Sequence, residues 1–316
     1  MYKRMLVPLD GSELAEVVFT YAKELAGRLD LDVILLHVYG PEERVLAPMH
    51  RAYVEHAAEV IRQECTEVQR RTGAPVGCKP IEARGELAVG YPAEEILSYA
   101  EKNDIDLILM ATHGRSGVRR WVMGSVVDKV LRASKVPVWL VRAGIPQEVI
   151  YDQWPRVTIL VPLDGSRLAR AVLPHVETLA KQRGAELVDV VFLRVYEPPI
   201  VIPSGRSPDI SLSWDRYIEK EVARRRAVSE QYLARIERRF KFLGINARSE
   251  VLMGKPAGEI IKYANKNPFN LIVMATHGYS GVSRWALGSV AEKVLLGVTS
   301  PILLVRPRSL SRSRID

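Results

Sequence analysis

Cysteine and long apolar runs are scarce in this sequence. The two cysteines, Cys65 and Cys78, do not have the spacing of metal ligands, and we interpret both as incidental thiols. No apolar run approaches the roughly 18 residues of a membrane-spanning helix, and the N-terminus leads into a strand-like run without a signal peptide. We therefore expect a cytoplasmic protein that does not bind a membrane.

Motifs that carry enzymatic chemistry are also missing. The chain has no G-x-x-x-x-G-K-(S/T) segment of the kind that holds phosphates in many ATPases. No cluster of histidine, cysteine and acidic residues suggests a metal site or an activated nucleophile. Because phosphoryl transfer normally needs a lysine, metal ligands and a placed nucleophile, we predict no catalytic residues, no metal ligands and at most slow hydrolysis of a bound nucleotide.

Length and composition favour two soluble domains. The chain has 316 residues, of which 47% are hydrophobic and 26% charged. Residues 1–150 carry 19 Lys and Arg against 21 Asp and Glu, a net charge of −2, whereas residues 151–316 carry 26 against 16, a net charge of +10. Much of this surplus lies at 216–241 and in the tail. A solvated basic face explains it best, and a surface for an acidic partner or nucleic acid is the weaker alternative.

One stretch occurs twice, at Ala111–Leu131 and at Ala275–Leu295, and 15 of its 21 aligned positions are identical. Each copy follows a short apolar run, typical of a buried strand, and ends in a helix-like pattern. Glycine allows positive φ and a close approach of the backbone to a ligand. The glycines of the two copies are Gly114, Gly117 and Gly124, and Gly278, Gly281 and Gly288.

The residue after the last glycine, Ser125 or Ser289, stands where a helix N-cap is expected. The first amides of the helix and the positive end of its dipole then point toward the glycine loop. This arrangement predicts a site for a phosphate chain. The alternative is a glycine-rich turn that only reverses the chain, and the presence of two copies makes this alternative weaker.

A second motif, L-V-P-L-D-G-S, begins at Leu6 and again at Leu160, and nine of ten aligned positions are identical. The pattern predicts a strand that turns at Gly11 into a helix capped by the following serine. Asp10, and Asp164 in the second copy, are thereby left at the carboxyl end of a strand. Their carboxylates are either acceptors for a ribose or base, or members of an Asx turn with their own backbone.

Strands and helices alternate in each half as β-α-β-α-β-α-β-α-β, which predicts a parallel sheet covered on both faces. The expected fold class is α/β, with two similar doubly wound domains that each contain a five-stranded parallel sheet. We expect these domains at residues 1–145 and 154–308, followed by a basic tail at 309–316. Long helices are expected at His50–Arg71 and Trp214–Leu243. The expected strands include Met5–Leu9, Leu31–Tyr39, Val76–Ala83, Leu107–Met110 and Pro137–Val141 in the first half, and Glu186–Tyr196, Ala247–Leu252, Leu271–Met274 and Pro301–Val305 in the second.

The two motifs resemble those of universal stress proteins in their tandem form, and the resemblance covers essentially the whole chain. Its most specific part is the signature G-x-x-G-x9-G-(S/T), present as Ala111-x-x-Gly114, nine residues and Gly124-Ser125, and again from Ala275. Both copies have alanine in place of the first glycine. The resemblance implies the strand order 3-2-1-4-5, which brings both motifs to one crevice at the strand ends.

The resemblance also implies that single-domain relatives dimerise through their last strand. We therefore expect Val138–Val141 and Ile302–Val305 to pair antiparallel within one chain, because two such apolar strands are unsuited to open sheet edges. One chain would then form a pseudo-dimer. A homodimer of the whole chain would use other surfaces.

In family members that bind ATP, the aspartate after strand one and a valine at the end of strand two hold the nucleoside, and the glycine loop holds the phosphates. The resemblance thus implies one adenine-nucleotide site in each half, with ATP as the cofactor and any Mg²⁺ held mainly by the phosphates. For the histidines of the two loops we favour loop organisation or ligand contact over general-base catalysis. The implied nucleotide-binding residues are Pro8, Leu9, Asp10, Val38, Met110, Ala111, His113, Gly114, Gly124, Ser125 and Val126, and Pro162, Leu163, Asp164, Val195, Met274, Ala275, His277, Gly278, Gly288, Ser289 and Val290.

The sequence therefore predicts a regulatory protein of the stress response that binds an adenine nucleotide in each half. The alternative is a scaffold of the same fold that binds no nucleotide and acts through protein contacts, for which the two alanines at 111 and 275 are the best support. An enzyme related to the adenine-nucleotide α-hydrolases is a third interpretation. It is the weakest because the S-G-G-x-D-S loop of that group is missing.

Overall fold

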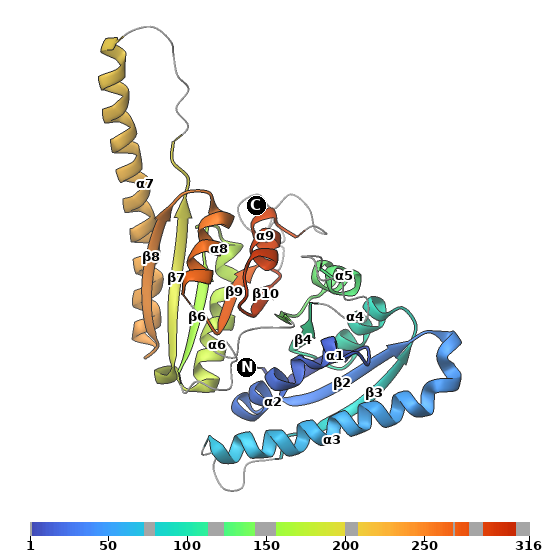
Figure 1. Cartoon of the computed structure of the whole chain (residues 1–316). Coiled ribbons are helices and arrows are strands. Elements are labelled where there is room, and N and C mark those ends of the chain that lie inside the picture. The colour runs from blue at the N-terminus through green and yellow to red at the C-terminus, as the bar shows by residue number, and fades with distance from the viewer. Residues whose placement is uncertain are drawn as a thin grey trace, which may run out of the picture.

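Ten strands form one continuous sheet in the order β3-β2-β1-β4-β5-β10-β9-β6-β7-β8 (Figure 1). This computed structural model describes residues 2–72, 80–112, 123–142, 156–199, 208–267, 269–277 and 287–307, with the backbone alone at 208–215. The first half contains β1 (Arg4–Leu9), α1 (Glu13–Glu16), α2 (Val18–Leu29), β2 (Asp32–Tyr39), η1 (Pro41–Leu46), α3 (Ala47–Arg71), β3 (Ala83–Val89), α4 (Pro92–Lys102), β4 (Leu107–Ala111), α5 (Ser125–Ala133) and β5 (Val138–Val141). The second half contains β6 (Val157–Pro162), η3 (Ala169–Val172), α6 (Leu173–Arg183), η4 (Ala185–Leu187), β7 (Val188–Tyr196), α7 (Pro208–Phe242), β8 (Asn246–Met253), α8 (Pro256–Lys266), β9 (Leu271–Ala275), α9 (Ser289–Gly297) and β10 (Ile302–Val305).

The expected α/β class and the strand order 3-2-1-4-5 are confirmed in both halves. The first half runs β3-β2-β1-β4-β5 and the second runs β8-β7-β6-β9-β10, with parallel neighbours in each. β5 and β10 join the halves as an antiparallel pair, with Leu140 opposite Ile302 and Trp139 opposite Leu303. The predicted pairing of the last strands is also confirmed, and it removes two apolar open edges.

Two hydrophobic cores cover the two faces of the sheet, and both continue across the joint between the halves. Successive side chains of a strand point to opposite faces. Accordingly, Trp139 and Leu303 belong to one core, whereas Leu140 and Ile302 belong to the other. Helices α2, α3, α6 and α7 pack on the first face, and α4, α5, α8 and α9 pack on the second (Figure 1).

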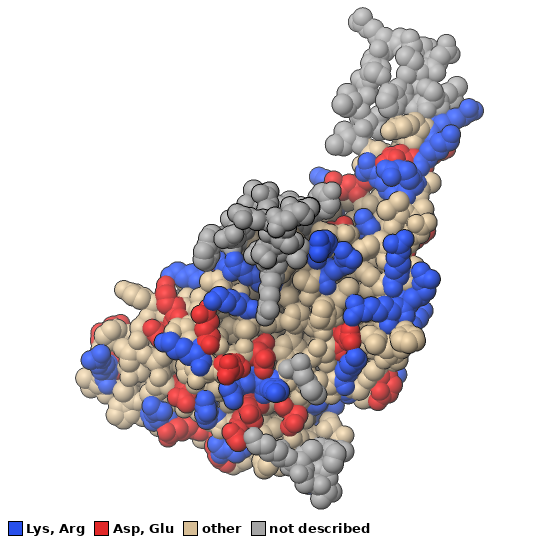
Figure 2. All heavy atoms as spheres, turned by 180° about the vertical axis from the view of Figure 1, so that it is seen from behind, with Lys and Arg blue, Asp and Glu red and all other residues tan. Residues whose placement is uncertain are grey.

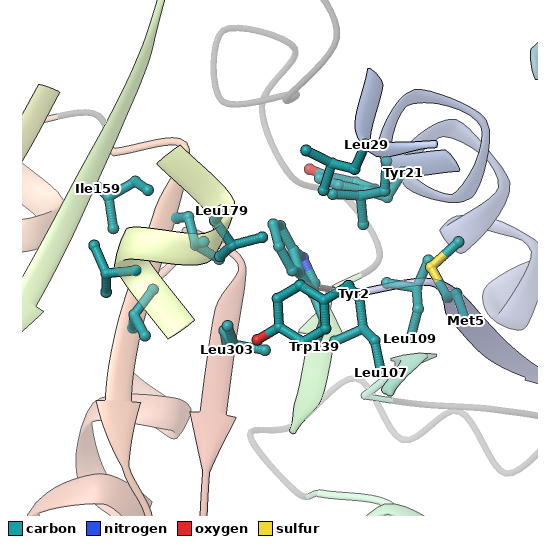
Figure 3. Close-up of a cluster of buried hydrophobic side chains, with 14 of the residues drawn as sticks. Tyr2, Met5, Tyr21, Leu29, Leu107, Leu109, Trp139, Ile159, Leu179 and Leu303 are labelled. Atoms are coloured by element: carbon teal, nitrogen blue, oxygen red, sulfur yellow. The ribbon is translucent and has the colours of Figure 1, made fainter. Parts of the chain in front are cut away.

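Direct contacts outside the sheet also join the halves. The Tyr2 hydroxyl lies 2.7 Å from Nδ1 of His175, and the Gln182 amide donates to the backbone oxygens of Tyr2 at 3.1 Å and Leu29 at 2.9 Å. Tyr2 is buried, and this burial raises the pKa of its hydroxyl. Figure 3 shows Tyr2 close to Trp139 between the two halves. The halves therefore share a packed interface as well as a sheet.

The third strand of the first half is not where its apolar residues predict it. The expected strand at Val76–Ala83 is wrong: β3 begins where that range ends, and residues 73–79 lie outside the described part. β3 is an edge strand, so most of its residues are half-buried or exposed, and charged residues at 84 and 86 interrupt its apolar residues. Gly85 interrupts the pattern further, because a Cβ there would lie 2.6 Å from the backbone of Val54 in α3.

Other boundaries differ by a few residues. α3 begins at Ala47 rather than His50, and α7 begins at Pro208 rather than Trp214. The segment between β2 and α3, expected to be a proline-bearing loop, contains the 3-10 helix η1. β7 begins at Val188 because the short helix η4 occupies the expected start of the strand.

Candidate functional site

A cleft with a volume of about 780 Å³ lies at the carboxyl ends of β1, β2 and β4. This volume is within the range of roughly 300–1,000 Å³ that is typical of small-molecule sites. The described residues that the sequence places at the first nucleotide site all line it. They are Pro8, Leu9, Asp10, Val38, Met110, Ala111, Gly124, Ser125 and Val126.

The second half has a cleft of about 420 Å³ at the equivalent ends of β6, β7 and β9. Its lining again includes the described residues that the sequence assigns to the second site, which are Pro162, Leu163, Asp164, Val195, Met274, Ala275, His277, Gly288, Ser289 and Val290. The remaining loop residues named from the sequence lie outside the described part. These are His113, Gly114, Gly117, Gly278 and Gly281.

Asp10 and Asp164 each form an Asx turn at the wall of a cleft. Oδ1 of Asp10 accepts hydrogen bonds from the backbone N–H of Ser12 at 3.0 Å and from its hydroxyl at 2.6 Å. Oδ1 of Asp164 accepts from the backbone N–H of Ser166 at 2.8 Å. The intervening glycines have φ values of 75° and 91°, which other residues rarely adopt. The turn fixes each carboxylate beside its cleft, so the two interpretations of these aspartates are compatible.

Helices α5 and α9 begin at the clefts, but their caps differ from the prediction. The N-cap residues are Gly124 and Gly288, and the serines that follow are the first helical residues. The φ values of these glycines are −58° and −62°, so positive φ does not explain them. Close packing does: a Cβ at 124 would lie 3.3 Å from the backbone oxygen of Thr112, and one at 288 would lie 2.9 Å from that of Thr276.

The first turn of each of these helices faces a cleft. An α-helix leaves its first amides without acceptors inside the helix. The first intrahelical bond is 2.9 Å long in each helix, from the amide of Asp128 to the Gly124 oxygen and from the amide of Glu292 to the Gly288 oxygen. The amides of residues 125–127 and 289–291 come before these donors, so they have no acceptor within the helix. Both sets of residues line the clefts. Together with the positive end of the helix dipole, these amides form a wall suited to an anion.

Ala111 and Ala275, which replace glycines of the family signature, fit without strain. They are the last residues of β4 and β9, and both are buried. In the described part of the chain, the non-glycine residues with positive φ are Asp30 and Asp104. Both alanines therefore have ordinary strand geometry, and their methyl groups give no reason against a ligand in the clefts.

The turn between the third strand and the next helix forms a wall of the first cleft that the sequence did not predict, whereas the second cleft is lined at this place by Pro256, the first residue of α8. The Gly90 amide donates to the Tyr39 oxygen at 3.0 Å, and the Gly254 amide donates to the Tyr196 oxygen at 2.9 Å. These bonds hold the turn against the end of the second strand. The segment Gly-x-Pro-Ala, which starts at both glycines, is the repeated signal that could have identified it.

The two clefts are not chemically identical. In the lining of the first cleft, buried His37 has its Nδ1 3.0 Å from the Leu9 oxygen and its ring 4.5 Å from that of His50. In the second half, the corresponding strand position holds Arg194, which lies 4.9 Å from the centre of the Tyr232 ring. Near the second cleft, His277 has its Nδ1 3.0 Å from the Thr276 hydroxyl, a local bond that orients the ring.

Part of the basic surplus of the second half lies on α7, which carries nine Lys and Arg against six Asp and Glu, and Figure 2 shows basic side chains along this helix. Many of them have acidic partners: Arg224 and Arg225 pair with Glu221, and Arg226 pairs with Glu230. Exposed pairs of this kind contribute little to stability. Their presence agrees with the interpretation of α7 as a solvated basic face.

Neither a membrane helix nor a metal cluster occurs among the described residues. No helix in these ranges is long and apolar enough to cross a membrane, and no group of three or more His, Cys, Asp or Glu is placed to hold a metal ion. Cys65 is buried in α3, and burial raises the pKa of its thiol to about 12. A thiol of this kind is not a nucleophile near neutral pH. Cys78 lies outside the described residues.

Comparison with known proteins agrees with this architecture. A sequence model of the universal stress protein family matches residues 1–142 and 156–306. The chain is 25% identical over 310 residues to a universal stress protein of Mycolicibacterium smegmatis, which covers 96% of this chain and 97% of that protein. It is also 29% identical over 142 residues to a universal stress protein of Methanocaldococcus jannaschii, which covers 45% of this chain and 83% of that protein.

Among solved structures, a universal stress protein from Archaeoglobus fulgidus has a TM-score of 0.63 and 19% identity, with 97% of both chains covered. At this identity, the likeness shows the fold alone. The two matched sequence regions account for most of the chain, and each contains a five-stranded unit with a cleft at its strand ends. The chain therefore belongs to the universal stress protein family, in its tandem form.

Proposed function

We propose that each half of the chain binds one adenine nucleotide, with ATP as the preferred ligand, and that occupancy regulates the protein in a stress response. One observation carries the proposal: in each half, a fixed aspartate and the first turn of a helix line the same cleft. An acceptor for hydroxyl groups then faces a cluster of amide donors across a cavity of suitable size. A nucleotide has ribose hydroxyls and phosphates at its two ends, and so matches both walls.

Each wall has a distinct role in this proposal. Asp10 and Asp164 accept hydrogen bonds from ribose hydroxyls, while the main chain near Val38 and Val195 contacts the base. The amides of residues 125–127 and 289–291 bind phosphate oxygens, together with the glycine loops that precede them. The described residues offer no acidic cluster for a metal, so any Mg²⁺ is held mainly by the phosphates. Such a site binds and orients the nucleotide. We propose that hydrolysis is slow or absent, because the sequence has no G-x-x-x-x-G-K-(S/T) segment and no metal-binding cluster occurs among the described residues.

The test begins with purified protein that is denatured and analysed by chromatography for released nucleotides. Calorimetric titrations with ATP, ADP, AMP and cyclic nucleotides then measure affinity and the number of sites. We expect up to two sites per chain, tighter for ATP than for adenosine. If no adenine nucleotide binds more tightly than about 1 mM, the proposal is wrong and a scaffold of the same fold is the better description. Turnover above roughly 1 s⁻¹ would instead indicate an enzyme.

The substitution Asp164→Asn separates the two roles of this residue. Asparagine keeps an oxygen that can accept the 2.8 Å bond from Ser166, so the Asx turn should persist. It loses the charge that strengthens a bond to a ribose hydroxyl, which is worth about 1.5–3 kcal/mol. We expect the second site to weaken by roughly 10- to 100-fold in calorimetry. The first site provides the control, because Asp10→Asn should weaken it and leave the second unchanged. Equal affinities in wild type and both variants would remove the aspartates from the site.

A further inference from the structure

Arg142 and Arg306 occupy equivalent positions, because each directly follows the last strand of its half. Each side chain extends into the other half. Arg142 donates from Nη1 to the backbone oxygen of Val298 at 2.7 Å and from Nη2 to that of Leu296 at 3.1 Å. Arg306 donates from Nη1 to the backbone oxygen of Arg132. The two contacts thus run in opposite directions across the joint.

The carbonyls of Leu296 and Arg132 belong to the two helices whose first turns line the clefts, and the carbonyl of Val298 is at the C-cap of α9. Leu296 is the eighth residue of α9 and Arg132 is the eighth residue of α5, so the two contacts are equivalent. The last carbonyls of a helix have no N–H donor within the helix and lie at the negative end of its dipole. A guanidinium supplies both N–H donors and a positive charge. Arg142 is half-buried, and its burial lowers its pKa, so this contact is partly removed from water.

The strand ends that carry the arginines also bind the residues that precede the glycine loops. The Val141 oxygen accepts from the Thr112 amide at 2.9 Å, and the Val305 oxygen accepts from the Thr276 amide at 2.9 Å. These threonines lie at the beginning of the two loops, directly after the alanines that line the clefts. Each arginine therefore directly follows a valine that is bonded to the threonine at the edge of its own cleft. Its guanidinium is bonded to the carboxyl end of the helix that lines the other cleft.

We propose that Arg142 and Arg306 are positioning residues that act across the joint, Arg142 on the second cleft through α9 and Arg306 on the first cleft through α5. A helix of nine residues is only about 13 Å long, so its two ends move together. Loss of the arginine frees the carboxyl end and changes the direction in which the first amides point. Each site then depends on the half that does not contain it. The effect on affinity rests on the nucleotide function proposed above, whereas the effect on the helices does not.

Hydrogen exchange in the full-length protein without nucleotide tests the structural part. In Arg142→Ala, amides of α9 should exchange at least about fivefold faster while those of α5 stay within twofold of wild type, and Arg306→Ala should show the reverse. Arg156→Ala is the matched control, since Arg156 is an exposed arginine of the second half that pairs with Asp189 at 2.9 Å. This control should change neither helix. Faster exchange in the arginine's own half, or equal loosening of both helices, would overturn the proposal.

Calorimetry tests the functional part in variants that have one strong site. In an Asp10→Asn background the second site dominates, and Arg142→Ala should weaken it by about tenfold, or about 1.4 kcal/mol. In an Asp164→Asn background the same change should leave the first site within twofold. Arg142→Lys should restore most of the affinity, because an ammonium can still donate to one carbonyl.

The two proposals fail in different ways. If wild type binds no nucleotide, the proposed function is wrong, and the exchange of α5 and α9 alone decides whether the arginines act across the joint. If nucleotide binds but Arg142→Ala weakens both sites equally, or neither, the crossed role is wrong and the proposed function stands.

Discussion

Gly288→Val is expected to lower the affinity of the second site by about 100-fold. A Cβ at this position would lie 2.9 Å from the Thr276 backbone oxygen, a separation that real Cβ atoms essentially never show. The backbone would have to shift, although the Gly288 amide donates to this same oxygen at 2.8 Å and so closes the loop. The branched side chain would also crowd the cleft at the first turn of α9. Overpacking of this kind costs about 1–3 kcal/mol, the upper end of which corresponds to about 100-fold.

Calorimetry should report one remaining site in this variant and none in the double variant with Gly124→Val. Gly258→Ala is the control glycine substitution, because a Cβ at 258 in α8 would have no neighbour within 4 Å. It should leave both sites intact and stabilise the helix by up to about 1 kcal/mol. A double valine variant that still binds two nucleotides would show that these glycines serve only the turn.

Trp139→Ala is expected to lower the free energy of unfolding by about 3–5 kcal/mol. Trp139 is fully buried and lies opposite Leu303 in the antiparallel pair that joins the halves. Its ring belongs to the hydrophobic core that continues from one half to the other, so a cavity there weakens both. Chemical denaturation followed by circular dichroism measures the loss.

The matched aromatic control is Phe242→Ala, since 91% of Phe242 is exposed at the end of α7. It should change the free energy of unfolding by less than about 0.5 kcal/mol. A loss of under about 1 kcal/mol for Trp139→Ala would mean that the joint can repack, and would contradict the idea that the shared core holds the halves together.

The residues that line the clefts show how much of the site can be predicted from local sequence patterns. The two repeated motifs identify the strand ends, the aspartates and the starts of the helices, and residues from both motifs line the same cavities. The strand order that brings them together came from the family resemblance, since periodicity alone cannot order parallel strands. For Gly124 the expectation of positive φ was wrong: its φ is −58°, and a Cβ there would lie 3.3 Å from the Thr112 oxygen. A glycine that permits positive φ and one that permits close packing look alike in a sequence.

By itself, the sequence determined the two repeats, the alternation of strands and helices, the apolar strands at the joint and the residue types at the clefts. These features are local, because each depends on hydrophobic period, turn chemistry or capping within a few residues. Only the tertiary structure decided the position of β3, the wall formed by the Gly-x-Pro-Ala turn, and the bond from Arg142 to Val298, which are 156 positions apart. An edge strand needs no apolar alternation, and a bond between distant residues depends on how their elements pack. Neither leaves a periodic signal along the chain.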